Sequence, residues 1–358
     1  MTGIASYREL TYDSSTDFDG SPITLFHFPD NHEEQEQQTF ELRYAGSYSE
    51  NIDYVVGVSY FDQEMFVGER RDFGVADIAG VTELSHDSIG IFAELDYLIN
   101  DKTKITLGAR WTEESKDVTF NAIGSCEKDF SSCSGPSSGL MRSGTYDDTT
   151  PKIAVTHSLN EDVNIYASYT QGFRSGSFDA RARTIDSFLN SQPGPEEVTS
   201  IELGLKSTFN DGKVLLNIAL FQADYDDIQK LALEECDVNI DTCPSGRIQR
   251  LINAAKATIE GIEIETKLSI TDQLSIEGSL GYTDAGFDEF LGFDADGVRG
   301  YDPVTDPVAA AALKFERVPE LTYNIMANYF QPLANGCLLY TSDAADDTPC
   351  VDLGGRRI

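Results

Sequence analysis

The amino-acid sequence predicts an all-β fold, an antiparallel transmembrane β-barrel of which only part is present. Segments of about ten residues alternate apolar and polar side chains, which is the period of a β-strand. Short turns alternate along the chain with long polar connections, as they do in barrels that keep their turns on one side of a membrane and their long loops on the other. The sequence contains no apolar run of about 18 residues, so it predicts no transmembrane helix.

The alternation is clearest in residues 257–270. Four aliphatic residues fall on one side of this segment: Ile262, Ile264, Leu268 and Ile270. Glu263 and Glu265 fall on the other side, because the side chains of a strand alternate between its two faces. Similar segments begin near Tyr54, Ile89, Ile105, Val163 and Leu274. About twelve such strands run from GIASYREL through PELTYNIMANYF, and we expect their apolar rows to face lipid and their polar rows to face a lumen.

The connections between these segments distinguish a barrel from a soluble β-sandwich, whose strands alternate in the same way. Short turns are predicted at 49–52, 100–103, 160–163, 210–213 and 271–274. Long polar loops are predicted at about 12–35, 62–86, 120–147, 174–196, 226–250 and 287–317. A sandwich has no reason to place every long connection at one end, so the pattern favours the barrel. Five tyrosines near strand ends are expected in aromatic girdles at the membrane surfaces: Tyr54, Tyr60, Tyr97, Tyr169 and Tyr282.

The charge of the chain and the lack of catalytic motifs narrow the function. The formal net charge is -35 at pH 7, which repels phosphate backbones and argues against nucleic acid as a partner. The sequence has no Ser-His-Asp spacing, P-loop, Rossmann glycine pattern or HExxH motif. Glu196 and Glu202 are interpreted as lumen or strand-entry residues rather than paired catalytic carboxylates. We therefore predict no enzyme activity, no catalytic residue, no cofactor and no metal site.

Four cysteines outside the C-terminal tail form two closely spaced pairs, Cys126 with Cys133 and Cys236 with Cys243. Each pair closes a short loop, and no histidine or third cysteine is placed to complete a zinc site. Two local disulfides in an oxidising compartment fit this spacing better than free thiols in flexible loops. Both pairs fall in predicted long loops, so we expect both disulfides on the extracellular side.

The last residues, 337–358, differ from the rest of the chain. After Gly336 the alternation of apolar and polar residues stops. Residues 337–346 can be encoded by TGT CTC TTA TAC ACA TCT GAC GCT GCC GAC, and residues 351–358 by GTA GAT CTC GGT GGT CGC CGT ATC. These strings resemble the two arms of a sequencing adapter. We therefore expect 337–358 to be a non-native, disordered tail and leave it out of the fold prediction. The sequence also begins without a basic-then-apolar leader, so we expect the natural N-terminus to be missing.

Three stretches carry a resemblance to a known family: NIYASYTQGFRSGSF at 164–178, PEEVTSIELGLKSTFNDGKVLLNIALFQADYDDIQ at 195–229 and NAAKATIEGIEIETKLSITDQLSIEGSLGYTDAGF at 253–287. They resemble the barrel of TonB-dependent outer-membrane receptors, and the likeness covers nearly all of residues 1–335. In that family a closed barrel of 22 strands surrounds a plug domain. The resemblance therefore implies that 1–336 is a partial receptor barrel, with about 12 of 22 strands, that lacks the plug domain and the first and last strands.

The resemblance also implies a function and a location. Receptors of this family bind a scarce solute at the extracellular face of a Gram-negative outer membrane and import it with energy that TonB passes to the plug. The implied cargo is a ferric siderophore or another iron complex. The implied partners are that small molecule, outer-membrane lipid, and TonB through the missing N-terminal plug region.

Other functions remain open at the level of sequence. Uptake of cobalamin or oligosaccharide by the same receptor class is an alternative cargo. A passive outer-membrane porin shares the barrel and the alternation of short turns with long loops. A soluble all-β adhesion or binding module is a third alternative, which the lipid-facing rows argue against.

One motif is a candidate for ligand binding. The stretch GFRSGS, residues 172–177, lies where a strand is expected to leave the membrane. Arg174 is able to bind an anionic ligand bidentately, and Phe173 and Ser175 flank it. The alternative is that Arg174 anchors the loop by bonding to neighbouring carbonyl oxygens.

Overall fold

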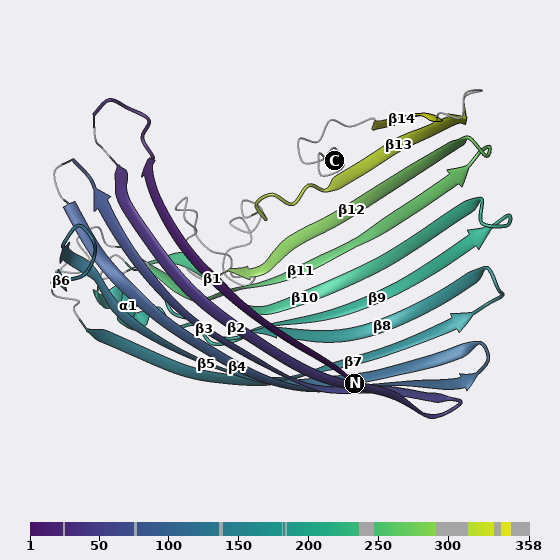
Figure 1. Ribbon diagram of the computed structural model, residues 1–358, viewed down its shortest axis with the longest axis horizontal. Coiled ribbons are helices and arrows are strands. Elements are labelled where there is room, and N and C mark those ends of the chain that lie inside the picture. The colour runs from purple at the N-terminus through teal and green to yellow at the C-terminus, as the bar shows by residue number, and fades with distance from the viewer. Residues whose placement is uncertain are drawn as a thin grey trace.

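The computed structural model describes residues 1–23, 26–74, 77–135, 139–180, 182, 185–235, 247–290, 314–332 and 338–344. These residues form one antiparallel sheet of 14 strands, curved into an open trough (Figure 1). The unclosed, antiparallel, almost purely β architecture confirms the predicted fold class. Among the described residues, no helix is long and apolar enough to cross a membrane.

The strands follow one another through the sheet in chain order, and β6 pairs with β5 beside this path. The long strands are β1 (Thr2–Asp17), β2 (His27–Ser49), β3 (Ile52–Asp72), β4 (Asp77–Asn100), β5 (Thr103–Cys126), β7 (Leu140–Ser158), β8 (Val163–Arg174), β9 (Glu196–Phe209), β10 (Val214–Glu235), β11 (Arg247–Ser269), β12 (Leu274–Phe290) and β13 (Leu321–Pro332). The short elements are β6 (Cys133–Ser134), β14 (Leu338–Ala344) and helix α1 (Ile185–Asn190). The long strands are those that the sequence predicted, and β6 and β14 are additional.

The five predicted turns are confirmed. They join β2 to β3, β4 to β5, β7 to β8, β9 to β10, and β11 to β12. In turn 210–213, Asn210, Asp211 and Gly212 have φ angles of 55°, 54° and 84°, a left-handed conformation that Gly, Asn and Asp adopt at the least cost. These turns gather at one end of the trough, here called the turn end, and the long connections lie at the other, here called the loop end (Figure 1).

Four of the predicted long loops, at 12–35, 62–86, 120–147 and 226–250, are shorter in the structure because the strands continue past the expected membrane, whereas the loop predicted at 174–196 agrees with the ends of β8 and β9. The loop predicted at 62–86 was wrong, since β3 continues to Asp72 and pairs there with Asp77, the first residue of β4. In this part of β3 both faces carry polar residues such as Gln63 and Glu64. The alternation that marks a strand therefore ends, although the backbone ladder continues to satisfy its hydrogen bonds.

The sheet has two chemically different faces. On the outer face, apolar residues lie directly opposite one another from strand to strand: Ile165, Leu205, Ile218, Ile264, Leu280 and Tyr323. Neighbouring positions point to the inner face, where Glu263 lies opposite Ala219, and Ala219 opposite Gly204. The Tyr166 ring covers Gly204, and its hydroxyl donates a hydrogen bond to Glu202. An apolar outer face and a polar inner face are what the sequence predicted for lipid and lumen.

The C-terminal tail differs from the prediction. Residues 338–344 form β14, which pairs with β13 along a ladder from Pro332 and Leu338 to Met326 and Ala344. The disorder expected for 337–358 is therefore wrong for these 7 residues. The edge of β13 presents unpaired backbone N–H and C=O groups, and an extended segment binds such an edge through main-chain hydrogen bonds. The adapter origin of the tail stays a prediction.

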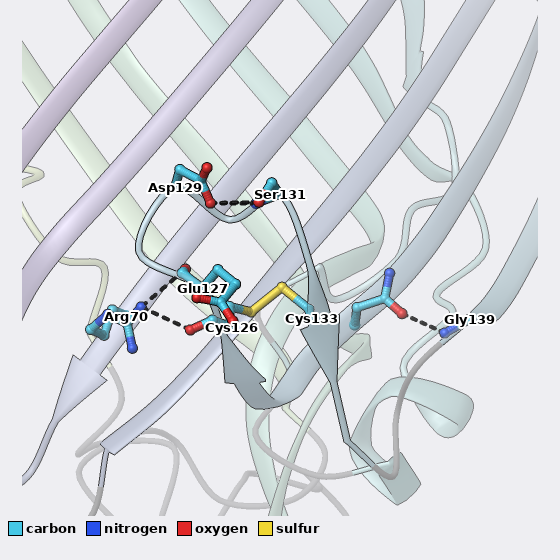
Figure 2. Close-up of a disulfide and its surroundings, with 8 residues drawn as sticks. Arg70, Cys126, Glu127, Asp129, Ser131, Cys133 and Gly139 are labelled. Atoms are coloured by element: carbon cyan, nitrogen blue, oxygen red, sulfur yellow. Dashed lines mark hydrogen bonds between the residues drawn. A yellow bond between two sulfur atoms is a disulfide. The ribbon is translucent and has the colours of Figure 1, made fainter.

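The connection between β5 and β7 carries a disulfide (Figure 2). Cys126, at the end of β5, is joined to Cys133 of β6, with the two Cα atoms 4.1 Å apart. Arg70 of β3 donates hydrogen bonds of 3.2 Å to the carbonyl oxygens of Cys126 and Glu127. Residues 127–132, here called the disulfide loop, are therefore tied to a nearby strand as well as closed by the bond.

The disulfide loop packs on the outer face. Its Phe130, at a φ of 57°, is 5% exposed. Phe130 fills the space above Gly68, where a Cβ atom would come within 2.5 Å of the ring, and it packs against buried Val81. Gly68 and Val81 lie opposite each other on the outer face of β3 and β4. The second predicted pair, Cys236–Cys243, lies outside the described residues.

Candidate functional site

The connection between β8 and β9 crosses the inner face of the sheet at the loop end. Its described residues, 175–180, 182 and 185–195, are here called the inner strap. Phe188 of α1 stacks on Phe120 of β5, with ring centroids 4.3 Å apart. The Ser187 hydroxyl donates a hydrogen bond to the carbonyl oxygen of Gln249 in β11. Because β5 and β11 lie far apart in the sheet order, a segment that touches both must run across the hollow of the trough.

An apolar cluster anchors the inner strap to β5. Its buried members are Val118, Phe120, Phe178, Ala182 and Phe188, and Leu140 packs against them. Fully burying such large side chains contributes about 1.5–3 kcal/mol each. On the far side of the trough, Asp186 of α1 pairs with Arg250 of β11 at 2.5 Å. The strap is therefore held by apolar packing on one wall and by polar contacts on the other.

Gln229 of β10 clamps both ends of the inner strap. Its side chain is nearly buried, at 6% exposure. The amide nitrogen donates to the carbonyl oxygens of Ser175 (2.8 Å) and Gly194 (3.1 Å), and the amide oxygen accepts from the Ser177 hydroxyl (2.7 Å). The first and the next-to-last residues of the strap are therefore hydrogen-bonded to one side chain.

Asn253 of β11, directly opposite this glutamine in the ladder, completes the clamp. Its amide oxygen accepts from the backbone N–H of Gly194 at 2.7 Å, and its amide nitrogen donates to the Gly194 carbonyl oxygen at 3.1 Å. The same nitrogen donates to the carbonyl oxygen of Asp227 at 2.6 Å. Asp227 has a φ of 54° and lies at a register irregularity of β10, and such bulges redirect the side chains next to them.

A charged cluster lies under the start of the strap. Lys116 of β5 donates to the Ser175 hydroxyl (2.5 Å) and to the Gly176 carbonyl oxygen (3.1 Å), and its ammonium lies 3.5 Å from the Glu114 carboxylate. Glu114 also accepts a hydrogen bond from Ser175 and lies 3.2 Å from Nε2 of His86. The partly buried charges are thus paired and hydrogen-bonded, which offsets the cost of their partial desolvation.

The three residues predicted to bind ligand do not converge in the structure. Arg174, the last residue of β8, has a side chain that is 66% exposed, and its guanidinium lies 3.9 Å from the Glu196 carboxylate. Phe173 points to the opposite face of the strand, because it is the neighbour of Arg174 in a regular ladder and successive side chains alternate between the two faces. Ser175 is 3% exposed. Of the three, only Arg174 is exposed, and ligand binding by these residues stays a prediction.

The described residues of the strap are held by packing and hydrogen bonds, and the exposed side chain of Arg174 lies beside them. Ser175 is buried and already hydrogen-bonded to Glu114 and Lys116, so it is not presented as a nucleophile. In the part of the chain that the structure describes, no group of three His, Cys, Asp or Glu residues is arranged to hold a metal ion. What the site contains is a folded segment across the mouth of the trough, with an exposed arginine beside it.

Sequence reasoning missed the residues that hold the strap. Gln229 stands between Ile228 and Lys230, Asn253 stands between Ile252 and Ala254, and no spacing motif marks either residue. The one local signal is Asp226 followed by Asp227, which interrupts the alternation of β10 where the register shifts. Such an interruption indicates a bulge, although it does not indicate which segment the redirected side chain will meet.

Comparison with known proteins adds a family. Residues 2–355 match the family model described as TonB dependent receptor-like, beta-barrel. The solved structure of the ferric yersiniabactin uptake receptor FyuA from Yersinia pestis is similar over 96% of this chain and 46% of that chain, with 16% identity and a TM-score of 0.71. The siderophore receptor PiuA from Acinetobacter baumannii is similar over 91% and 49%, with 16% identity and a TM-score of 0.66.

A third structure widens the range of cargo among similar folds. The copper transporter OprC is similar over 91% of this chain and 50% of that chain, with 14% identity and a TM-score of 0.58. The chain therefore spans about half the length of the structures that it matches. At such identities the likeness establishes the fold, whereas the solute that each protein carries is a matter of its own loops.

Proposed function

Because the chain belongs to the TonB-dependent receptor family, as a part of its outer-membrane β-barrel, we propose that it forms one wall of a transporter that imports a scarce solute. The proposed cargo is a ferric siderophore or another iron complex. The energy for import comes from TonB, which acts on a plug domain contributed by the N-terminal region of the full-length protein. The chain itself supplies the lipid-facing wall and part of the ligand entrance.

The observation that carries this proposal is the inner strap at the loop end of a receptor barrel. A segment held at both ends by Gln229 and Asn253 presents a preorganised surface to an incoming solute, and preorganisation lowers the entropy cost of binding. Arg174 stands exposed next to it and is proposed to bind an anionic group of the cargo, with Phe173 and Ser175 as its neighbours. The similarity to FyuA, a ferric yersiniabactin uptake receptor, and to PiuA, a siderophore receptor, supports an iron complex as the first cargo to test.

The test is uptake by the full-length protein in a strain that lacks its own siderophore receptors. Radioactive iron bound to a panel of siderophores is expected to enter only when both the protein and TonB are present. Saturable uptake of cobalamin or an oligosaccharide instead would change the cargo within the same class. Uptake that is independent of TonB and linear in solute concentration would replace the proposal with a passive porin.

A further inference from the structure

An open depression of about 810 Å³ lies on the outer face of β2–β5. Its floor contains Ala93 and Ala109, which lie directly opposite each other in the β4–β5 ladder and are too short to fill the space between their neighbours. Larger side chains line it as well, among them Leu42, Tyr44 and Trp111. The depression, here called the lipid groove, is continuous with the apolar rows of the outer face.

The outer face changes from apolar to acidic toward the loop end of the same strands. Along β3, outer-face positions run from apolar Val58 to acidic Asp62 and Glu64. Val58 and Asp62 are four residues apart, which corresponds to about 13 Å along a strand. Asp62 lies directly opposite Asp87, and Glu64 directly opposite Glu36. Like charges in such pairs destabilise a sheet. Cations near these carboxylates would relieve the repulsion.

The protein does not supply those cations in the part that the structure describes. The ion pairs on β2 and β3 toward the loop end use other carboxylates: Asp13, Asp30, Glu34 and Glu69. A polar pocket of about 410 Å³ follows on the same four strands, lined by Glu36, Glu64, Glu83 and Asp117 with Phe66 among them. Phe66 and Glu83 also line the adjoining pocket beside the disulfide loop. The lipid groove is therefore followed along β2–β5 first by the carboxylate pairs and then by the polar pocket.

We propose that this column binds one outer-membrane lipid with a phosphate headgroup. An acyl chain lies in the lipid groove, and Mg²⁺ or Ca²⁺ joins the lipid phosphate to the carboxylates of Asp62 and Asp87. Mg²⁺ is commonly held by one or two carboxylates together with phosphate oxygens and water. This mode fits a surface where no three described side chains form a metal site by themselves. The inference goes beyond solute import and requires only that the outer face meets lipid.

Lipid binding is measured on the full-length receptor, purified in detergent and presented with lipid A, by native mass spectrometry. The protein is expected to bind lipid A in MgCl2. Its affinity is expected to fall about fivefold or more when EDTA replaces MgCl2, or when the lipid offered is lipid A without phosphates. The double substitution Asp62→Asn, Asp87→Asn is expected to weaken binding by a similar factor. Ala109→Phe, which fills the groove and leaves the carboxylates intact, is expected to weaken it as well.

The matched control is Glu260→Gln with Asp284→Asn. These two acids also lie directly opposite each other on the outer face, on β11 and β12, away from the lipid groove, so this variant is expected to bind like the unaltered protein. Heat-modifiable gel mobility verifies that each variant is folded. Equal binding in MgCl2 and EDTA, or equal loss in the control, overturns the proposal. Solute import is scored separately, so its failure with intact lipid binding overturns only the proposed function.

Discussion

The inner strap and the disulfide loop connect strands at the same end of the sheet, yet they are held in different ways on opposite faces. The strap lies on the inner face and is held by hydrogen bonds from Gln229 and Asn253 and by the stacking of Phe188. The disulfide loop lies on the outer face and is closed by Cys126–Cys133. The contacts that hold the strap are non-covalent and can open without breaking a bond, whereas the disulfide loop opens only when its disulfide is reduced.

This difference assigns different roles to the two connections. Non-covalent contacts of a surface segment open and re-form in local fluctuations that cost less than global unfolding. A disulfide in an oxidising compartment persists. We therefore expect the amides of the inner strap to exchange through local opening and the disulfide loop to keep its shape.

The largest effect is expected from Phe188→Ala. Truncating a buried phenylalanine costs about 3–5 kcal/mol, and Phe188 is 0% exposed. Hydrogen exchange of the strap amides is therefore expected to accelerate by about a hundredfold or more. Phe130→Ala in the disulfide loop is the matched control, because it removes a similarly buried ring from a covalently closed segment. Unchanged exchange in the strap of the first variant would show that the polar clamp is sufficient by itself.

The assignment of the two faces is tested by Ile264→Arg. Ile264 belongs to the outer apolar row, and an arginine that faces the middle of a bilayer costs about 2–4 kcal/mol of barrel stability. Glu263→Arg, one position away on the inner face, is expected to cost far less. Refolding of the full-length protein into lipid vesicles measures both. Equal costs would mean that both faces are packed, and a two-layer soluble module would then replace the barrel.

The covalent half of the contrast is tested by Cys126→Ser with Cys133→Ser. By the chain-entropy relation a loop this short is stabilised by about 2–3 kcal/mol, so amides of residues 127–132 are expected to exchange faster in the variant. The strap amides are expected to exchange at the same rate in both proteins. Treatment of the unaltered protein with a reductant is expected to reproduce the result. A change in the strap as well would show that the two connections are coupled.

The contrast also explains what was predictable from the sequence. Two features that were predicted depend on local chemistry. The turn at Asn210–Gly212 depends on the left-handed φ that Asn, Asp and Gly adopt, and the apolar row through Ile264 depends on the two-residue period of a strand. The strap depends on contacts such as Gln229 to Ser175, which are 54 residues apart, and no local pattern encodes that meeting. The loop at 62–86 was predicted too long because the alternation ends before the ladder does.

The smallest expected effect concerns Arg174 and the proposed cargo. Its guanidinium is 66% exposed and lies 3.9 Å from Glu196, a loose pair that leaves donors free to bind an anionic group. An exposed charge contributes about 1 kcal/mol, so Arg174→Ala is expected to weaken binding of an anionic iron complex about fivefold. Arg174→Lys keeps the positive charge but loses the planar guanidinium. Its affinity for the complex is expected to lie between that of the unaltered protein and that of Arg174→Ala.

Arg43→Ala is the matched control, because Arg43 also lies on the inner face but is paired with Glu41 at 2.7 Å. It is expected to bind the cargo like the unaltered protein. Titration of the purified full-length variants, with tryptophan fluorescence as the readout, gives the dissociation constants. A high-salt titration adds a second test, because an exposed ion pair is screened by salt. Unchanged affinity in Arg174→Ala would leave Arg174 as an anchor of the strap through Glu196, whose carboxylate also accepts a hydrogen bond from the backbone of Gln229.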